Sequence, residues 1–206
     1  MSKVNPSFLN EIDISLGPVL ASTSRFRAAQ LKTLGLTFDA VPPNVDETPL
    51  KSETPEQLVK RLGREKALAV ATTHPTRVVI GGDQIAVFNG SILGKPGSAA
   101  AAAQQLARFS GHRVEFLTHC SVMAGAGRSQ WHHTDHTWVE FRDLTEAEIQ
   151  RYIALDNPVD CAGGFKIEGL GVTLFDRVRS DDPSALIGLP LLFVSRALRH
   201  YGYALP

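Results

Sequence analysis

Polar residues that could bind an anion gather where a short apolar segment meets a helix pattern. Ser22, Ser24 and Arg27 follow the apolar residues 19–21 and open a segment with helical spacing. Backbone amides at a helix N-terminus, hydroxyl groups and a guanidinium together make a site for a phosphate-sized anion. The same residues also fit a serine N-cap beside a solvated arginine, so this cluster alone leaves both interpretations open.

Carboxylates and a lysine form two further clusters. Asp46 and Glu47 leave a proline-constrained loop, and such oxygens suit a hard divalent cation. Asp83 follows an apolar strand pattern in Gly81-Gly82-Asp83-Gln84, a placement that suits a general base for water or a metal ligand. Lys95, in a glycine–proline loop, could reach a phosphate as a point charge. A turn-forming aspartate is the alternative interpretation for Asp83.

Glu168 and a histidine triplet complete the candidate groups. Glu168 follows an apolar segment and could accept two hydrogen bonds from a base edge with adjacent donors; a surface charge beside a turn is the alternative. His132, His133 and His136 resemble a metal set, but residues 131–141 predict a strand. Alternation along a strand separates His132 and His136 from His133, which argues against a shared metal.

The elements that must position these residues mix strands and helices. The apolar spacing predicts strands at 19–21, 38–41, 77–80, 85–88, 91–93, 113–123, 131–141, 159–165 and 172–178. It predicts helices at 25–34, 55–73, 98–109, 145–155 and 187–201, two of them opened by capping boxes at Thr54 and Thr145. This order predicts an α/β fold with a mixed central β-sheet flanked by helices. Residues 1–18 are expected to be a loosely ordered leader before a single domain at 19–206.

The composition excludes several classes of protein. Of 206 residues 43% are hydrophobic and 20% charged, as in globular proteins. Lys and Arg total 21, as do Asp and Glu, so the chain lacks the positive field that favours nucleic-acid binding. Cys120 and Cys161 are too widely separated for a zinc motif. Without an apolar run of the ~18 to 20 residues that span a bilayer, and without a secretory signal, we expect a cytoplasmic protein with no membrane partner.

The order and spacing of the clusters resemble the Maf family of nucleoside triphosphate pyrophosphatases, from about Val19 to Tyr201. The matching segments are Leu20-Ala21-Ser22-Thr23-Ser24 with Arg27, Val45-Asp46-Glu47-Thr48, Arg61 with Glu65-Lys66-Ala67, Ile80-Gly81-Gly82-Asp83-Gln84, Gly94-Lys95-Pro96, Ser110-Gly111, and Cys161-Ala162-Gly163-Gly164-Phe165-Lys166 with Glu168-Gly169. The resemblance implies a two-lobed, Maf/ITPase-like fold with a cleft between the lobes.

Three positions are similar to the branch of that family that acts on 7-methyl-GTP. Phe26 is aromatic, Gln84 replaces a common Thr, and Glu168 replaces a Gln. Methylation at N7 makes guanine cationic, and an aromatic face attracts a flat cation. Glu168 could accept the two adjacent N–H groups of guanine and complement the ring charge. Uracil and thymine offer one such donor and no charge, so a site built this way should reject them.

The resemblance implies hydrolysis between the α- and β-phosphates of a nucleoside triphosphate, and a homodimer. It makes Asp83 the general base and Glu47 a ligand of Mg²⁺ or Mn²⁺. The triphosphate would be positioned by Ser24, Arg27, Lys66 and Lys95. Two alternatives remain open: the dTTP/UTP branch of the family, and a non-catalytic nucleotide-binding regulator of cell division.

Overall fold

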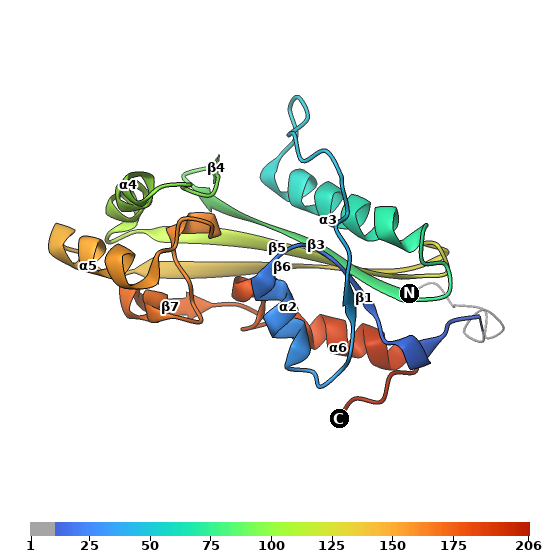
Figure 1. The fold of residues 1–206 in the computed structure, drawn as a ribbon. Helices are drawn as coiled ribbons and strands as arrows, with labels where there is room; N and C mark the ends of the chain where they lie inside the picture. The colour runs from blue at the N-terminus through green and yellow to red at the C-terminus, as the bar shows by residue number, and fades with distance from the viewer. Residues whose placement is uncertain (1–10) are drawn as a thin grey trace.

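A mixed sheet of seven strands organises the chain, as the computed structural model of residues 11–206 shows (Figure 1). The strand order is β2-β1-β3-β5-β6-β7, with β4 paired to β3. β1 pairs in parallel with β2 and β3, and the other pairs are antiparallel, which confirms the predicted mixed sheet. The strands are β1 (Val19–Ala21), β2 (Asp39–Ala40), β3 (Val78–Phe88), β4 (Ser91–Leu93), β5 (Arg113–Ala124), β6 (Ser129–Phe141) and β7 (Phe175–Arg179).

Five α-helices flank the sheet, and both predicted capping boxes form at their starts. Thr54 and Gln57 cap α3, and Thr145 and Glu148 cap α5, each pair exchanging hydrogen bonds between side chain and backbone. The helices are α2 (Arg25–Lys32), α3 (Pro55–Ala71), α4 (Ala99–Phe109), α5 (Glu146–Asp156) and α6 (Leu191–His200). Short 3₁₀ helices lie at η1 (Ile14–Leu16), η2 (Ala162–Gly164), η3 (Leu170–Leu174) and η4 (Ala185–Ile187).

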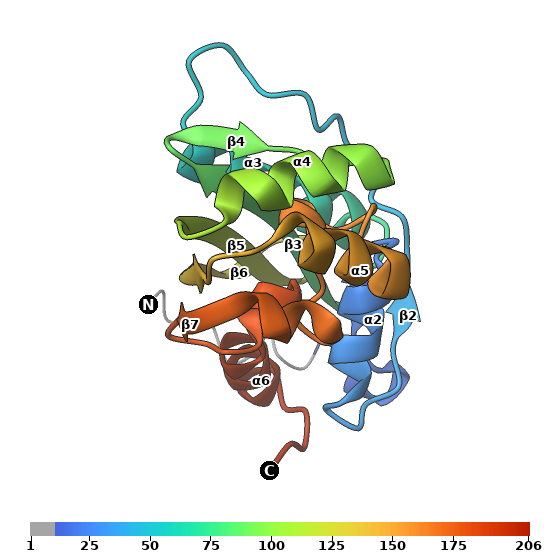
Figure 2. The same ribbon diagram turned by 90° about the vertical axis from the view of Figure 1, so that its left-hand side faces the viewer.

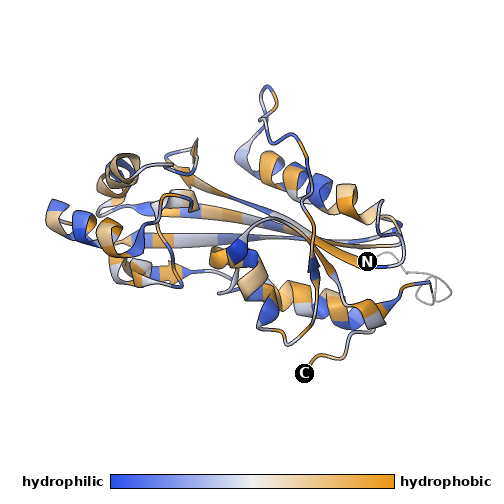
Figure 3. Ribbon diagram, in the orientation of Figure 1, coloured by the Kyte–Doolittle hydropathy of each residue, from blue (hydrophilic) through white to orange (hydrophobic). Residues whose placement is uncertain are grey.

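The long strands β3, β5 and β6 run through two lobes (Figure 1). At one end α2 and α6 bury Leu31, Val194 and Leu198 against the sheet, while α3 packs on it with Ala67 and Val70. At the other end α4, α5 and β7 enclose an aromatic core, and Figure 2 faces this end. The helices alternate hydrophobic and hydrophilic positions along the ribbon, as expected of helices lying on a sheet (Figure 3).

The predicted break between strands 77–80 and 85–88 is wrong, because β3 continues without interruption from Val78 to Phe88. The two glycines inside it mark close packing instead of a turn. A Cβ atom on Gly81 would lie 2.5 Å from the amide N of Ala67 in α3, and one on Gly82 would lie 2.8 Å from the carbonyl O of His119 in β5. Asp83 therefore stands in the middle of a rigid strand.

Three further predicted boundaries differ from the structure. Residues 159–165 form a turn and η2, because Gly163 and Gly164 adopt positive φ angles of 74° and 69° that a strand cannot contain. The strand predicted at 172–178 begins only at Phe175, after η3. The last helix begins at Leu191 and not at 187, after Pro190.

The N-terminal segment is packed where the structure describes it. Ile12 is buried in the core beside α6, and the Arg77 guanidinium donates hydrogen bonds to the carbonyls of Leu16, Gly17 and Pro18. The first ten residues of the predicted leader lie outside the described residues. From residue 11 onward, no helix has both the length and the apolar character needed to cross a membrane.

Candidate active site

One cavity of about 890 Å³ brings together nine of the residues that the sequence predicts for the site, while the candidate Asp46 does not line it. It opens beside the middle of β3, between the start of α2 and the loop before α3 on one side and the segments after β4 and α5 on the other. The predicted residues in its lining are Ser24, Phe26, Arg27, Glu47, Lys66, Asp83, Gln84, Lys95 and Glu168. Their shared position is established by the structure, while their individual roles stay predictions.

A buried ion-pair cluster lies at the floor of this cavity. The Lys66 Nζ on α3 is 2.7 Å from the Asp83 Oδ1 on β3 and 2.8 Å from the Glu47 Oε1 in the loop. The side chains of Lys66 and Asp83 are only 7% and 10% exposed, whereas that of Glu47 is 61% exposed. Charges this deeply buried are tolerated when they are paired, so Lys66 and Asp83 hold each other in place.

The same carboxylates test whether the site fits a divalent cation. Across residues 11–206 no group of three or more His, Cys, Asp or Glu side chains is arranged to hold a metal ion. Mg²⁺, however, is usually bound through one or two carboxylates, with substrate phosphates and water completing its shell. Glu47 and Asp83 supply such oxygens around one cationic centre. The residues therefore fit a metal that arrives with a phosphate ligand, and do not form a cage of protein ligands.

The start of α2 forms one wall of the cavity and carries the groups predicted to bind an anion. The Ser24 Oγ accepts the backbone N–H of Arg27 at 3.3 Å, and the Ser22 Oγ accepts the N–H of Ser24 at 3.1 Å. Ser24 is thus the predicted N-cap, and the helix N-terminus faces the cavity. The Arg27 Nε donates to the carbonyl of Gly188 at 3.1 Å, while its terminal nitrogens and Lys95 have no hydrogen-bond partner in the described chain. These free donors can bind phosphate oxygens.

The same cavity could hold a ring. Phe26, also in the first turn of α2, is half-buried in its lining, and the Cζ of Arg25 lies 4.9 Å from the centroid of its ring. Glu168 is exposed at the rim, so a ligand would have to cover it before its charge is desolvated. Burial raises the pKa of Cys161 to about 11, which keeps this thiol protonated and unsuited to act as a nucleophile.

Gln84 has a positioning role that the sequence did not reveal. Its Nε2 donates to the Thr118 Oγ1 at 2.9 Å and to the carbonyls of Ala185 and Leu186 at 3.0 and 3.1 Å. Because carbonyls only accept, these bonds orient the amide and leave Oε1 as the group free for a ligand. The role in substrate specificity that the resemblance implies for Gln84 remains a prediction, while its link from β3 to η4 is a finding.

Gln30 holds the α2 wall of the cavity in place, and the sequence analysis missed it. It is buried on α2, where its Nε2 donates to the carbonyls of Ser184 and Leu189, both at 2.6 Å. Its Oε1 accepts the backbone N–H of Leu189 at 2.9 Å. A glutamine among the apolar positions of a helix was the available signal, because a buried amide needs partners.

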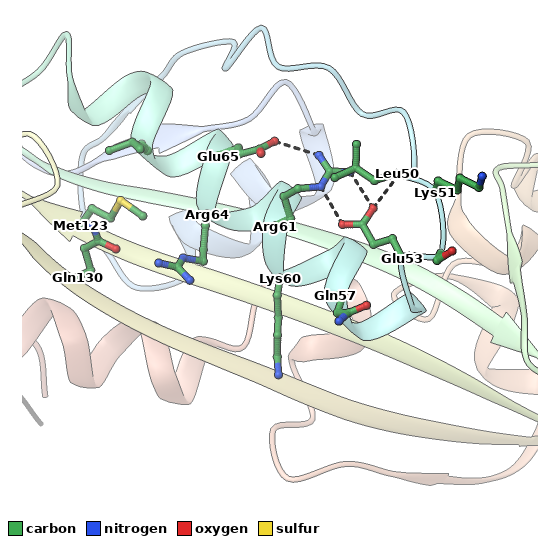
Figure 4. A pocket seen from close by; sticks show the side chains of 12 residues that line it. Leu50, Lys51, Glu53, Gln57, Lys60, Arg61, Arg64, Glu65, Met123 and Gln130 are labelled. Carbon is green, nitrogen blue, oxygen red and sulfur yellow. Dashed lines mark hydrogen bonds and ion pairs between the residues drawn. The ribbon is translucent and has the colours of Figure 1, made fainter.

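A second pocket, of about 770 Å³, follows the outer side of α3 (Figure 4). Arg61 is central to it and binds both carboxylate oxygens of Glu53 at 2.8 and 2.9 Å, Glu65 at 3.1 Å, and the carbonyl of Thr48 at 3.1 Å. None of the nine predicted residues in the first cavity lines this pocket. Arg61 ties the preceding loop to α3 through Glu53 and Thr48.

The histidine triplet is divided as predicted. The His132 ring stacks on His119 with centroids 5.8 Å apart, whereas the His133 ring stacks on Phe193 of α6 at 5.4 Å. Since α3 and α6 cover opposite faces of the sheet, the two rings point in opposite directions (Figure 1).

Comparisons with known proteins show the family to which the sequence belongs. The family model described as "Maf-like protein" matches residues 18–201. A 7-methyl-GTP pyrophosphatase of Xanthomonas campestris pv. campestris (strain 8004) is 49% identical over 188 residues, 91% of this chain and 97% of that protein. A 7-methyl-GTP pyrophosphatase of Aromatoleum aromaticum is 49% identical over 189 residues, with the same coverage of both chains. The structure of the Staphylococcus aureus Ham1 protein matches 61% of this chain and 71% of its own, at a TM-score of 0.39 and 17% identity.

Proposed function

Since this chain belongs to the Maf-like protein family, we propose that it is an enzyme that hydrolyses 7-methyl-GTP to 7-methyl-GMP and pyrophosphate. The observation that carries the proposal is a single cavity lined by the ion-paired carboxylate Asp83 and by two unlike sets of groups. One set offers cationic and hydroxyl donors for phosphates. The other offers an aromatic ring and a carboxylate for a flat, cationic base.

Asp83 is suited to act on the attacking water. Its Oδ1 is held by the Lys66 Nζ at 2.7 Å, and this contact fixes the carboxylate on β3. Oδ2 makes no hydrogen bond within the described chain and can accept a proton from water. That water attacks the α-phosphorus of the nucleotide. The P–O bond between this phosphorus and the leaving pyrophosphate breaks, and Asp83 holds the proton that the water releases.

The triphosphate is positioned by donors from three segments. The Ser24 hydroxyl and the terminal nitrogens of Arg27 approach from α2, Lys95 from the loop after β4, and Lys66 with its remaining N–H from α3. Positioning and charge stabilisation carry much of the catalysis of phosphoryl transfer. When bound, Mg²⁺ or Mn²⁺ would neutralise the phosphates, and Glu47, the most exposed carboxylate of the cluster, would hold it.

The base is selected by the residues around Phe26 and Glu168. Phe26 would stack on 7-methylguanine, and Glu168 would accept its two adjacent N–H groups and lie beside its positive charge. The Oε1 of Gln84 is the acceptor left free nearby. A cytoplasmic location and a homodimer stay predictions from the sequence.

The test is pyrophosphate release from 7-methyl-GTP, GTP, dTTP and UTP, with Mg²⁺ and then with excess chelator. We expect the highest kcat/KM for 7-methyl-GTP and loss of turnover on chelation. A preference for dTTP or UTP would assign the chain to the other branch. Tight nucleotide binding without pyrophosphate release from any substrate would support the non-catalytic regulator and overturn the proposed reaction.

A further inference from the structure

The ring that should receive the base is already covered by a cation of the protein itself. Arg25, the first residue of α2, places its Cζ 4.9 Å from the centroid of the Phe26 ring. Successive residues on a helix point in different directions, so Arg25 must fold back across the ring to make this contact. Arg25 is exposed, Phe26 is half-buried, and both line the cavity.

Phe26 is the partner that holds this guanidinium. Within residues 11–206 the Arg25 side chain makes no ion pair and no hydrogen bond. The carboxylates of Asp160 and Glu168 line the same cavity. All three charges act on the thiol of Cys161, together with Lys166: burial raises the pKa of the thiol most, Lys166 and Arg25 lower it, and Glu168 and Asp160 raise it. Arg25 thus brings a positive charge to the part of the cavity around Phe26, where the base would lie.

We propose that Arg25 is a specificity-determining residue whose charge, once displaced from the face of Phe26, repels a cationic base and so lowers the preference for 7-methylguanine over guanine. The inference rests on the proposed function. Either base must move the guanidinium off the ring before it can stack. Only the methylated base carries a positive charge of its own, so only this base is repelled by the displaced guanidinium. The repulsion weakens the binding of 7-methylguanine and not that of guanine.

The size of the effect follows from the exposure of Arg25. A cation–π contact at an exposed site corresponds to about a two- to five-fold change in an equilibrium constant, and a charge repulsion in the same solvent-accessible place is of similar order. Attraction of Arg25 for the triphosphate is common to both nucleotides, so it cancels in the ratio of their kcat/KM values. The ratio therefore isolates the effect at the base.

The test compares Arg25→Gln with Arg25→Lys in slightly acidic buffer, where the methylated ring keeps its N1 proton and its charge. We expect Arg25→Gln to raise the kcat/KM ratio of 7-methyl-GTP to GTP by about two- to five-fold, through a lower KM for 7-methyl-GTP. Arg25→Lys keeps the charge and should leave the ratio near that of the wild type. A ratio that is unchanged or lower in Arg25→Gln would overturn the inference, as would an equal loss for both substrates.

Nucleosides provide a second measurement without phosphates. Calorimetric titration with 7-methylguanosine and guanosine should show the methylated nucleoside gaining affinity in Arg25→Gln, and guanosine gaining less. Equal gains would overturn the inference. Failure of the proposed function would be seen in the wild type, as no hydrolysis of 7-methyl-GTP or a preference for pyrimidine nucleotides. If the wild type is active on 7-methyl-GTP and Arg25→Gln has the same kcat/KM ratio of 7-methyl-GTP to GTP, only the role of Arg25 would be overturned.

Discussion

Asp83 combines two properties that a general base needs, a fixed position and a free oxygen. The ion pair with Lys66 fixes the carboxylate, and Oδ2 remains available to water. In Asp83→Asn the amide oxygen can still accept the Lys66 ammonium, so the fold should persist while the base is lost. We expect kcat for pyrophosphate release to fall by about 10²- to 10⁴-fold.

Asp176→Asn is the matched control for this change, because Asp176 is exposed on β7 and does not line the cavity. It should keep wild-type turnover. Circular dichroism and thermal melting would verify that both variants are folded. Undiminished turnover in a folded Asp83→Asn protein would show that another group removes the proton.

Glu168 bears on which base is accepted. It is exposed in the free protein, so its contribution depends on desolvation by the bound base. Replacing it with Gln removes the negative charge and puts a donor next to the N–H groups of guanine. We expect kcat/KM for 7-methyl-GTP to fall by about 3- to 30-fold, with a smaller loss or a gain for UTP and dTTP.

Glu146→Gln, an exposed position on α5 outside the cavity, controls for the general loss of a negative charge. The ratio of kcat/KM for 7-methyl-GTP to that for UTP is the quantity to follow. If Glu168→Gln changes this ratio no more than Glu146→Gln does, Glu168 has no part in recognition.

At the scale of elements, the loop before α3 depends on Arg61. This residue binds both oxygens of Glu53 and the carbonyl of Thr48, next in the chain to Glu47. Arg61→Lys cannot reproduce the two-point contact, because an ammonium is a single point charge. We expect Glu47 to be less well fixed, and the Mg²⁺ concentration for half-maximal turnover to rise by about 2- to 10-fold.

The control for Arg61 lies one residue earlier on α3. Lys60→Met removes an exposed ion pair with Glu56, a type of pair that contributes little. Its Mg²⁺ dependence should match the wild type. An Arg61→Lys protein with wild-type Mg²⁺ dependence would mean that the loop is held in place without this contact.

The sequence predicted elements well where the determinants are local. Both capping boxes and the short connection between the predicted strands 85–88 and 91–93 depend on neighbouring residues, and all three were placed correctly. Gly81 and Gly82 were taken to end a strand, but their small size is needed by α3 and β5, which lie far along the chain. Packing between distant elements overrode the local turn signal.

In the candidate site too, some features follow from local sequence and others depend on packing between distant elements. The sequence brought together nine residues that do line one cavity, although Asp83 and Gln84 lie in the middle of β3 and not at the strand end that the pattern predicted. It did not predict that Lys66 would bridge two carboxylates, since that depends on how closely α3 packs on β3. It also gave no sign that the Gln84 amide would be bound to the backbone of η4.

At the scale of the whole molecule, a buried histidine lies between α3 and the long strands that run through both lobes. His119 is 2% exposed and lies opposite Asp83 in the β3–β5 register. Its Nδ1 is 2.8 Å from the Thr134 Oγ1 and its Nε2 is 3.2 Å from the Ser121 Oγ. A Cβ atom on Gly63 of α3 would lie 2.7 Å from its ring, so there is no room for added solvation.

Burial lowers the pKa of His119 to about 3, and it also lowers the pKa of the stacked His132. In the unfolded chain a histidine titrates near its ordinary value of about 6.5. Below that pH the unfolded chain takes up a proton that the native protein refuses, so the free energy of unfolding falls as the pH drops toward about 3. One such group contributes a slope of at most about 1.4 kcal/mol per pH unit.

Urea unfolding between about pH 7 and pH 5 should reveal this slope, because most carboxylates titrate below that window. We expect His119→Gln to be less stable than the wild type near pH 7, since a cavity-forming change in a packed site is costly, but to lose less of its remaining stability by pH 5. His112→Gln, at an exposed position, should keep the wild-type slope. A His119→Gln protein with the wild-type slope would place the proton uptake on groups other than His119.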